Sequence, residues 1–191
     1  MLPLIFSFIL IAVFFSIESR LRFGEEAKSL DAAERDKKST SYIFKIFGIN
    51  ILCLLSVFIF NYFNLFKLFN NPFTAFVGIV LMLLGLFFRI YAVITLREYY
   101  TRTLKTITNQ KIIAKGMYKF IRHPGYLGLI LIWIGAGVSS NNYLALIIIS
   151  ILTISVYQFR IINEEKMLIE AFGDEYIKYK KNTWRLLPPL Y

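Results

Sequence analysis

Five apolar segments, separated by polar stretches, limit what this chain can fold into. They cover residues 2–17, 42–63, 73–96, 127–138 and 143–159. About 20 apolar residues in a helix cross the ~30 Å hydrocarbon core of a bilayer. The chain of 191 residues is 57% apolar, above the roughly one half usual in soluble domains, which indicates lipid-facing surface. The pattern predicts an all-α integral membrane protein with about five transmembrane helices in a single domain, residues 1–191.

The flanks of these segments add detail. The first has no basic residue before it and is followed by the charged Glu18, so we interpret it as a retained span rather than a signal peptide. Pro72 suits the first turn of the third span. Residues 139–142 join a helical hairpin whose first arm is short, about 12 residues or ~18 Å. The charged residues 163–182 predict an amphipathic helix, with a break at Gly173.

Two further features lie inside the spans. Gly78 and Gly85 share a helix face, as do Gly128 and Gly135, and such faces allow close helix packing. Arg89 lies within the third apolar segment. We expect its charge to face protein or water, or to reach the interface, because an unpartnered charge in lipid is costly.

The 22 Lys and Arg residues are distributed unevenly between the two sides that these spans define. Twenty-one of them fall in alternating regions, which lie on one side, whereas Lys67 lies on the other. Positive residues accumulate on the cytoplasmic side of membrane proteins. We therefore expect the amino terminus outside and the carboxyl terminus in the cytoplasm. The net charge of +10 then reflects topology rather than nucleic-acid binding.

Single copies of Cys and His exclude several kinds of site. Cys53 lies in an apolar segment, so neither a disulfide nor a cysteine cluster can form. His123 is the only histidine, which excludes a zinc or haem site built on several His or Cys ligands. A single histidine also gives no basis for a Ser-His-Asp triad. The sequence predicts no metal at the functional site.

Residues 116–128 combine aromatic, basic, Pro and Gly residues before the fourth span. Pro124 biases His123 away from helical backbone and can itself begin the next helix. Gly125 and Gly128 let another backbone or a ligand approach closely, and a helix start offers free N–H groups to an anion. The segment is either a nucleotide or cofactor pocket at the membrane edge, or an interfacial turn with Tyr anchors. The residues alone favour the turn.

A second group of candidates lies where the fifth span meets the terminal helix. Arg160 and Glu164 are four residues apart and share a helical face, with Glu165 beside them. They form either a surface salt bridge or two separate ligand contacts, with the guanidinium holding a carboxylate and the carboxylate pairing with an ammonium. Tyr176 and Tyr179 either wall a pocket or belong to an interfacial helix.

Together these groups resemble the isoprenylcysteine carboxyl methyltransferase family, including its shorter prokaryotic members. The resemblance covers about residues 103–188. It rests on Arg-His-Pro-x-Tyr at 122–126, the hairpin, Glu164-Glu165, Phe172-Gly173, two Tyr and a closing Pro. It implies three N-terminal spans over residues 1–97 and a catalytic region over 98–191, with a cytoplasmic cofactor site formed by a loop and the C-terminal helix.

The resemblance also implies the ligands and the residues that bind them. S-adenosylmethionine is the implied methyl donor, with S-adenosylhomocysteine as product, and the implied acceptor is a lipophilic carboxylate such as a prenylated cysteine, entering from the lipid bilayer. Arg160 matches the family's arginine for the substrate carboxylate, and Glu164 its acidic cofactor residue. The other implied cofactor-binding residues are Gln110, Lys111, Ile112, Ile113, Tyr118, His123, Pro124, Gly125 and Tyr126. Gln110 departs from the family, whose members often have His there.

Methyl transfer to a carboxylate needs little chemical assistance from a protein. A carboxylate is a nucleophile at neutral pH, so the reaction depends on alignment rather than on a general base. Two other hypotheses stay open. One is methylation of a phospholipid amine or a related superfamily reaction such as an NADPH-dependent reduction, and the other is a non-enzymatic membrane protein with this scaffold. Arg160 favours a carboxylate acceptor because a guanidinium repels an ammonium.

Overall fold

The computed structural model describes residues 2–21, 34–67, 71–100, 110–189 and 191. Its helices are α1 (Leu2–Arg20), α3 (Glu34–Tyr62), α4 (Pro72–Leu96), α5 (Pro124–Ser139), α6 (Tyr143–Phe172) and α7 (Asp174–Lys181), with short 3-10 helices η1 (Arg97–Tyr99) and η2 (Gly116–Lys119). Four of them, α1, α3, α4 and α6, are long and apolar enough to cross a membrane, and α5 is a shorter apolar helix. The predicted all-α membrane fold is confirmed.

The helix ends refine the predicted segments. α5 begins at Pro124, before the predicted apolar arm, so its 16 residues rise ~24 Å rather than ~18 Å. Pro72 is the first residue of α4, as predicted, and the Asn71 side chain caps that helix. The predicted fifth span and the first part of the charged stretch form one continuous helix, α6. α7 follows the predicted break at Gly173, whose φ is +54°. Half of the polar stretch between the first two predicted spans, residues 18–41, lies outside the described residues, which omit 22–33.

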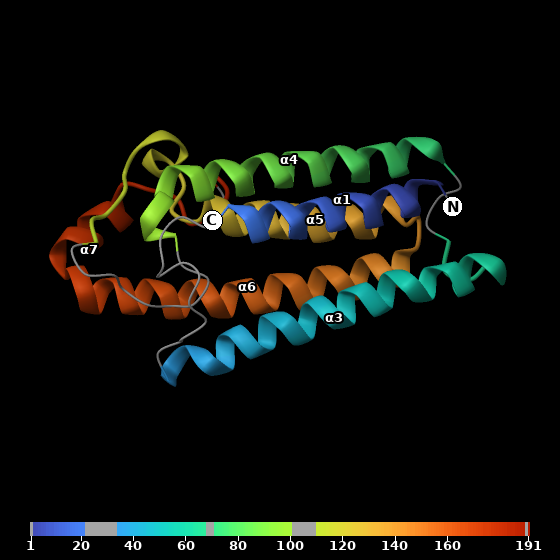
Figure 1. Ribbon diagram of the computed structural model, residues 1–191, viewed down its shortest axis with the longest axis horizontal. Coiled ribbons are helices and arrows are strands. Elements are labelled where there is room, and N and C mark those ends of the chain that lie inside the picture. The colour runs from blue at the N-terminus through green and yellow to red at the C-terminus, as the bar shows by residue number, and fades with distance from the viewer. Residues whose placement is uncertain (1, 22–33, 68–70, 101–109, 190) are drawn as a thin grey trace.

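Successive long helices run in roughly opposite directions, so α1, α4 and α6 point one way and α3 and α5 the other (Figure 1). The N-terminus, the end of α3, the start of α4 and the α5–α6 turn lie at one end of the bundle. The ends of α1, α4 and α6, the start of α5 and the whole of α7 lie at the other end (Figure 1). The regions that carry most of the positive charge therefore collect at one end, as the alternation in the sequence predicts.

Glycine contacts bring α4 and α5 into close packing. A Cβ built on Gly128 would lie 2.6 Å from the carbonyl oxygen of Gly85, and a Cβ on Gly135 would lie 2.6 Å from that of Gly78. Real side chains do not fit at such distances, so the two backbones touch because these residues are glycine. This packing fixes the start of α5, and with it the segment around His123, against α4.

Polar contacts join the remaining helices. Ser7 of α1 and Ser139 of α5 share a hydrogen bond of 2.5 Å between their hydroxyl oxygens. The Asn50 amide of α3 donates to the Thr153 hydroxyl of α6 at 3.0 Å, and both side chains are fully buried. Side-chain hydrogen bonds between helices contribute about 0.6 kcal/mol or more each in membrane proteins. The N-terminal helices are thereby held against the C-terminal pair, and a cavity remains between them.

Candidate active site

The segment before α5 adopts the turn that its sequence predicts. His123 has φ −125° and ψ 54°, outside the helical region, and Pro124 is the first residue of α5. The backbone N–H of Arg122 donates to the carbonyl oxygen of Trp184 at 2.8 Å, and the N–H of Trp184 donates to that of Phe120, also at 2.8 Å. The loop is therefore paired with the C-terminal tail.

A cavity of about 210 Å³ lies among the helices at this end of the bundle. Ten of the eleven residues that the sequence singled out line it: Gln110, Lys111, Ile112, Ile113, Tyr118, His123, Gly125, Tyr126, Arg160 and Glu164. The eleventh, Pro124, adjoins them as the first residue of α5. The structure thus brings residues of the loop, α5 and α6 around one space. Their roles toward a cofactor or an acceptor stay a prediction.

Three polar side chains form a connected group in the cavity wall. The Tyr126 hydroxyl donates to Glu164 Oε2 at 2.5 Å and accepts from Arg160 Nε at 3.1 Å. Arg160 is only 3% exposed, and its Nη1 also donates to Thr40 Oγ1 at 3.4 Å. The Glu164 side chain keeps 25% exposure. A tyrosine hydroxyl therefore links the two charges that the sequence placed on one helical face.

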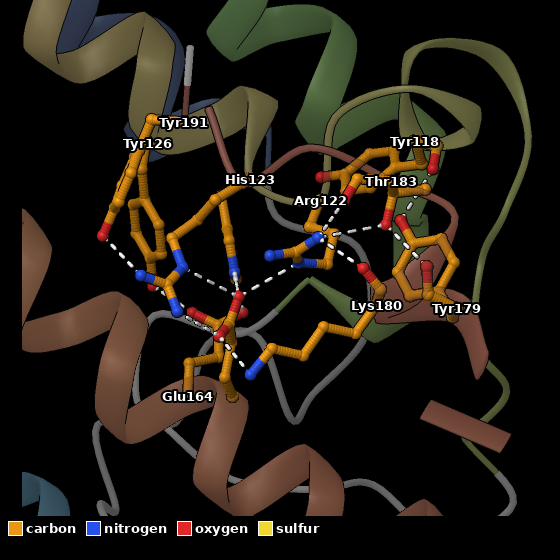
Figure 2. A network of polar contacts seen from close by, with 11 residues as sticks. Tyr118, Arg122, His123, Tyr126, Glu164, Tyr179, Lys180, Thr183 and Tyr191 are labelled. Atoms are coloured by element: carbon orange, nitrogen blue, oxygen red, sulfur yellow. Dashed lines mark hydrogen bonds and ion pairs between the residues drawn. The ribbon is translucent and has the colours of Figure 1, made fainter. Parts of the chain in front are cut away.

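Glu165, next to Glu164, contacts a different set of residues. Its carboxylate accepts from Arg122 Nε at 3.0 Å and from Arg185 Nη2 at 2.8 Å, and it lies 3.3 Å from Lys180 Nζ. Arg122 also donates to the carbonyl oxygen of Lys180 at 3.0 Å (Figure 2). Because its side chain is only 4% exposed, Glu165 fastens the loop and the tail to α6 rather than facing a ligand. In the sequence both glutamates are candidates for the site, but nothing there distinguishes these two tasks.

His123 lies between the two carboxylates (Figure 2). Its Nε2 is 3.3 Å from Glu165 Oε1, and its Nδ1 is 3.9 Å from Glu164 Oε1. Its ring stacks on Tyr126 with 5.6 Å between ring centroids. We assign the proton to Nε2, because it then donates to Glu165. The imidazole thus fixes the loop relative to α6.

An ion pair between α1 and α4 also lies in the cavity wall. Arg89 donates from Nε at 3.0 Å and from Nη2 at 2.7 Å to the Glu18 carboxylate, which also accepts from the Tyr100 hydroxyl. The side chains of Arg89 and Glu18 are only 11% and 9% exposed. Arg89 faces protein, one of the environments expected for it. The sequence did not identify its partner, which lies 71 residues earlier in the chain.

The remaining wall is largely apolar, and α1 and α3 supply much of it. Its residues there are Phe14, Phe15, Ile43, Phe44 and Phe47. Phe44 is 57% exposed and Phe15 is 40% exposed, so this side of the cavity reaches the lipid-facing surface of the bundle. Sequence reasoning missed these residues because cavity-facing and lipid-facing positions of a span are equally apolar.

Burial keeps the tyrosines on the loop side protonated. It raises the pKa of Tyr179 to about 12 and holds the pKa of Tyr118 well above its ordinary value. The Tyr179 hydroxyl donates to the Tyr118 carbonyl oxygen at 2.7 Å. The hydrogen bond from Arg185 to Glu165 raises the pKa of the Arg185 guanidinium. At neutral pH both hydroxyl groups therefore stay protonated, the Tyr179 hydroxyl acts as a donor, and the Arg185–Glu165 contact stays charged.

Fold and site together define a multi-pass helical membrane protein whose cavity joins charged side chains to an apolar, lipid-facing wall. Within the described ranges, no group of three or more His, Cys, Asp or Glu side chains could hold a metal ion. Comparison with known proteins narrows this class. The sequence profile of the isoprenylcysteine carboxyl methyltransferase (ICMT) family matches residues 77–170. The chain belongs to this family.

Several known proteins are similar to this chain in sequence. It is 32% identical over 134 residues to the protein-S-isoprenylcysteine O-methyltransferase of Saccharomyces cerevisiae, covering 69% of this chain and 56% of the yeast protein. It is 30% identical over 118 residues to a probable protein-S-isoprenylcysteine O-methyltransferase of Oryza sativa subsp. indica, covering 61% of this chain and 62% of the rice protein. These matches span less than two thirds of each relative.

A solved structure has a similar fold. It is the eukaryotic intramembrane Ras methyltransferase ICMT, solved without a monobody, with a TM-score of 0.66 and 22% identity. The match covers 75% of this chain and 52% of that one. The likeness therefore extends beyond the profile match and includes much of the helical bundle.

Proposed function

We propose that this protein transfers a methyl group from S-adenosylmethionine to the carboxylate of a lipophilic acid such as a prenylated cysteine. The observation that carries the proposal is the cavity itself, where Glu164 and Arg160 lie in one wall and the aromatic residues of α1 and α3 in another. One ligand with an ammonium and another with a carboxylate and a long apolar chain match these surfaces. Membership of the family supports the same reaction class.

The residues around the cavity fit S-adenosylmethionine, which when bound supplies an electrophilic methyl group on a sulfonium. The partly exposed Glu164 carboxylate suits the amino-acid ammonium of such a ligand. Lys111 is exposed at the cavity rim and suits its carboxylate. Tyr118, Tyr176 and Tyr179 offer aromatic surface for its adenine. We also propose that the charged end of the bundle faces the cytoplasm, from which a water-soluble cofactor would enter.

On the acceptor side the protein needs to bind the lipophilic acid and to align its carboxylate with the methyl group. Arg160 holds the acceptor carboxylate by its guanidinium edge, and Phe44 and Phe47 contact the apolar chain, which reaches the cavity from the bilayer. Because a carboxylate is already a nucleophile, no side chain needs to remove a proton. The contribution of the protein is alignment of the reacting atoms and exclusion of water, which together account for about 7–11 kcal/mol in well-oriented reactions.

A direct assay tests the proposal. Purified protein in lipid nanodiscs is incubated with S-adenosylmethionine carrying a tritiated methyl group, together with N-acetyl-S-farnesylcysteine. We expect base-labile methyl ester to form, and we expect none with the corresponding amide, which lacks the nucleophilic carboxylate. A protein that binds neither S-adenosylmethionine nor the acid would refute the proposal.

One relative favours a second acceptor class. The chain is 40% identical over 72 residues to methanethiol S-methyltransferase 1 of Bradyrhizobium diazoefficiens, covering 38% of this chain and 24% of that protein. A thiolate is also an anion that Arg160 could attract. The assay therefore includes an alkyl thiol and phosphatidylethanolamine as competing acceptors. Thioether formation faster than ester formation would replace the acid by a thiol, and methylation of the amine would favour a phospholipid acceptor.

Glu164→Gln tests the cofactor assignment. Loss of the charge should weaken S-adenosylhomocysteine binding by about 1.5–3 kcal/mol, the contribution of a hydrogen bond to a charged group. Isothermal titration calorimetry on wild type and variant measures the change. Glu170→Gln is the matched control, because Glu170 is exposed on the same helix and does not line the cavity. Equal affinity in wild type and Glu164→Gln would remove Glu164 from the cofactor site.

A further inference from the structure

Tyr126 connects the two charged side chains that the proposed function uses. Its hydroxyl donates to Glu164 Oε2 at 2.5 Å, and the same oxygen accepts from Arg160 Nε at 3.1 Å. The proton and a lone pair of the hydroxyl are both engaged, so the hydrogen bonds run without a gap from carboxylate to guanidinium. Glu164 and Arg160 lie one turn apart on α6, whereas Tyr126 comes from α5. The connection therefore depends on a residue from another helix.

Neighbouring rings hold Tyr126 in this position. It stacks on His123 at 23° between the ring planes (Figure 2), and its centroid lies 5.5 Å from that of Tyr157 on α6. Tyr157 is 1% exposed and lines the same cavity, but its hydroxyl has no hydrogen-bond partner within the described structure. Two adjacent tyrosines thus differ in what their hydroxyl groups bind. Tyr157 therefore allows the effect of the Tyr126 hydroxyl to be distinguished from the effect of a tyrosine ring in the cavity.

We infer that Tyr126 is a positioning residue that couples the methyl-donor side of the site to the acceptor side, so that a ligand on either side tightens binding on the other. The inference rests on the proposed function, in which an ammonium binds Glu164 and a carboxylate binds Arg160. It assigns to the Tyr126 hydroxyl a task beyond contact with the cofactor.

Electrostatics gives the sign of this coupling. When no cofactor is bound, the negative charge of the Glu164 carboxylate attracts Arg160 and repels an incoming carboxylate. An ammonium at Glu164 balances that charge. The acceptor carboxylate is then repelled less, and the Arg160 guanidinium binds it more tightly. Hydrogen bonds in a chain also polarise one another, and the first ligand orders side chains that the second then finds ordered. The coupling is therefore positive, and by thermodynamic linkage it is equal in both directions.

A binding experiment measures the coupling without any turnover. The dissociation constant of S-adenosylhomocysteine is determined by calorimetry in nanodiscs, with and without saturating N-acetyl-S-farnesylcysteine. For wild type we expect the acid to tighten binding about fivefold or more, the usual lower range of coupling between sites. For Tyr126→Phe, which keeps the ring and removes the hydroxyl, we expect less than about twofold tightening. The apparent KM for the acid should rise more than kcat falls, because the acceptor is aligned less well.

Tyr157→Phe is the matched control. It removes a hydroxyl that has no hydrogen-bond partner in the described structure, so the coupling should stay at the wild-type value. Wild-type coupling in Tyr126→Phe, or equal loss in both variants, would overturn the inference while leaving the proposed function intact. Wild-type protein that binds neither ligand would overturn the proposed function and the coupling with it.

A second variant keeps the inference testable if Tyr126→Phe does not fold. Glu164→Gln leaves Tyr126 in place but removes the charge at one end of the connection. The affinity for S-adenosylhomocysteine should fall. Saturating acid should then raise the remaining affinity by less than about twofold. Undiminished coupling in this variant would count against the hydroxyl as the connection. Thermal unfolding of each variant shows whether the protein is folded when the coupling is measured.

Discussion

Arg160 shows at the scale of one residue how burial and orientation prepare a site. A guanidinium that is 3% exposed is costly to bury unless hydrogen bonds satisfy it. Its Nε donates to Tyr126 and its Nη1 to Thr40, so residues of α5 and α3 fix the direction of the guanidinium plane. A planar fork held in this way can recognise a carboxylate in one orientation.

Substitution of Arg160 tests this role. An ammonium cannot reproduce two parallel hydrogen bonds. Arg160→Lys should therefore lower kcat/KM for methyl transfer, with a loss of about 2–4 kcal/mol in transition-state stabilisation, like the loss of one well-placed donor. Arg160→Ala should lower it at least as much. The affinity for S-adenosylhomocysteine should change little in the Lys variant. The measurements are steady-state kinetics and calorimetry on the same preparations.

Arg97→Lys serves as the control for Arg160→Lys, since Arg97 is exposed and does not line the cavity. Equal kcat/KM in wild type and both Arg160 variants would defeat the carboxylate assignment. Arg160 would then have only a structural role on α6, and the acceptor would belong to a class other than carboxylates.

The α4–α5 pair decides at the scale of elements where the loop before α5 lies. Gly128→Ala would place a methyl group 2.6 Å from the Gly85 carbonyl oxygen and 2.8 Å from the Arg89 backbone nitrogen, so the helices would have to separate. We expect a loss of about 1–3 kcal/mol in stability, the usual cost of overpacking. Thermal unfolding in detergent measures it. Arg89 of α4 pairs with Glu18 in the cavity wall. A displaced α4 would therefore change the shape of the cavity, and cofactor binding should weaken too.

Gly48→Ala is the control for this prediction. Gly48 lies within α3, and a Cβ there would meet no atom within 4 Å. Alanine should therefore leave stability unchanged or raise it by about 1 kcal/mol through its higher helix propensity. If Gly128→Ala unfolds no earlier than Gly48→Ala, the close contact between α4 and α5 does not limit stability.

In the described part of the chain, acidic and basic residues alike lie mainly at one end of the bundle (Figure 1). Lys67 is the only one of the 22 basic residues outside the alternating regions. It follows α3 and pairs with Asn142 in the α5–α6 turn, and that turn lies at the bundle end that holds the N-terminus (Figure 1). Positive charge on the cytoplasmic side then predicts an external N-terminus and a cytoplasmic C-terminus. A fluorescent protein that matures only in the cytoplasm should be bright when fused after Tyr191. The same reporter inserted after Lys67 should be dark, and the reverse pattern would invert the topology.

Much of this organisation could be predicted from the sequence because it depends on local chemistry. Long apolar runs become helices in lipid, where backbone groups must bond within the segment. Pro72 and Pro124 mark helix starts because Pro lacks an N–H and has a fixed φ. Gly173 ends α6 at a positive φ that other residues rarely adopt. Family resemblance added ten residues that the structure brings to one cavity.

Tertiary structure alone decided which residues meet across the bundle. Phe47 of α3 and Glu18 of α1 enter the cavity wall although nothing near them in the chain marks them for it. Glu164 and Glu165 are chemically identical neighbours, yet one faces the cavity and the other binds Arg122 and Arg185, because helix geometry points successive side chains about 100° apart. Such contacts depend on how distant helices pack, and local sequence patterns carry no information about that packing.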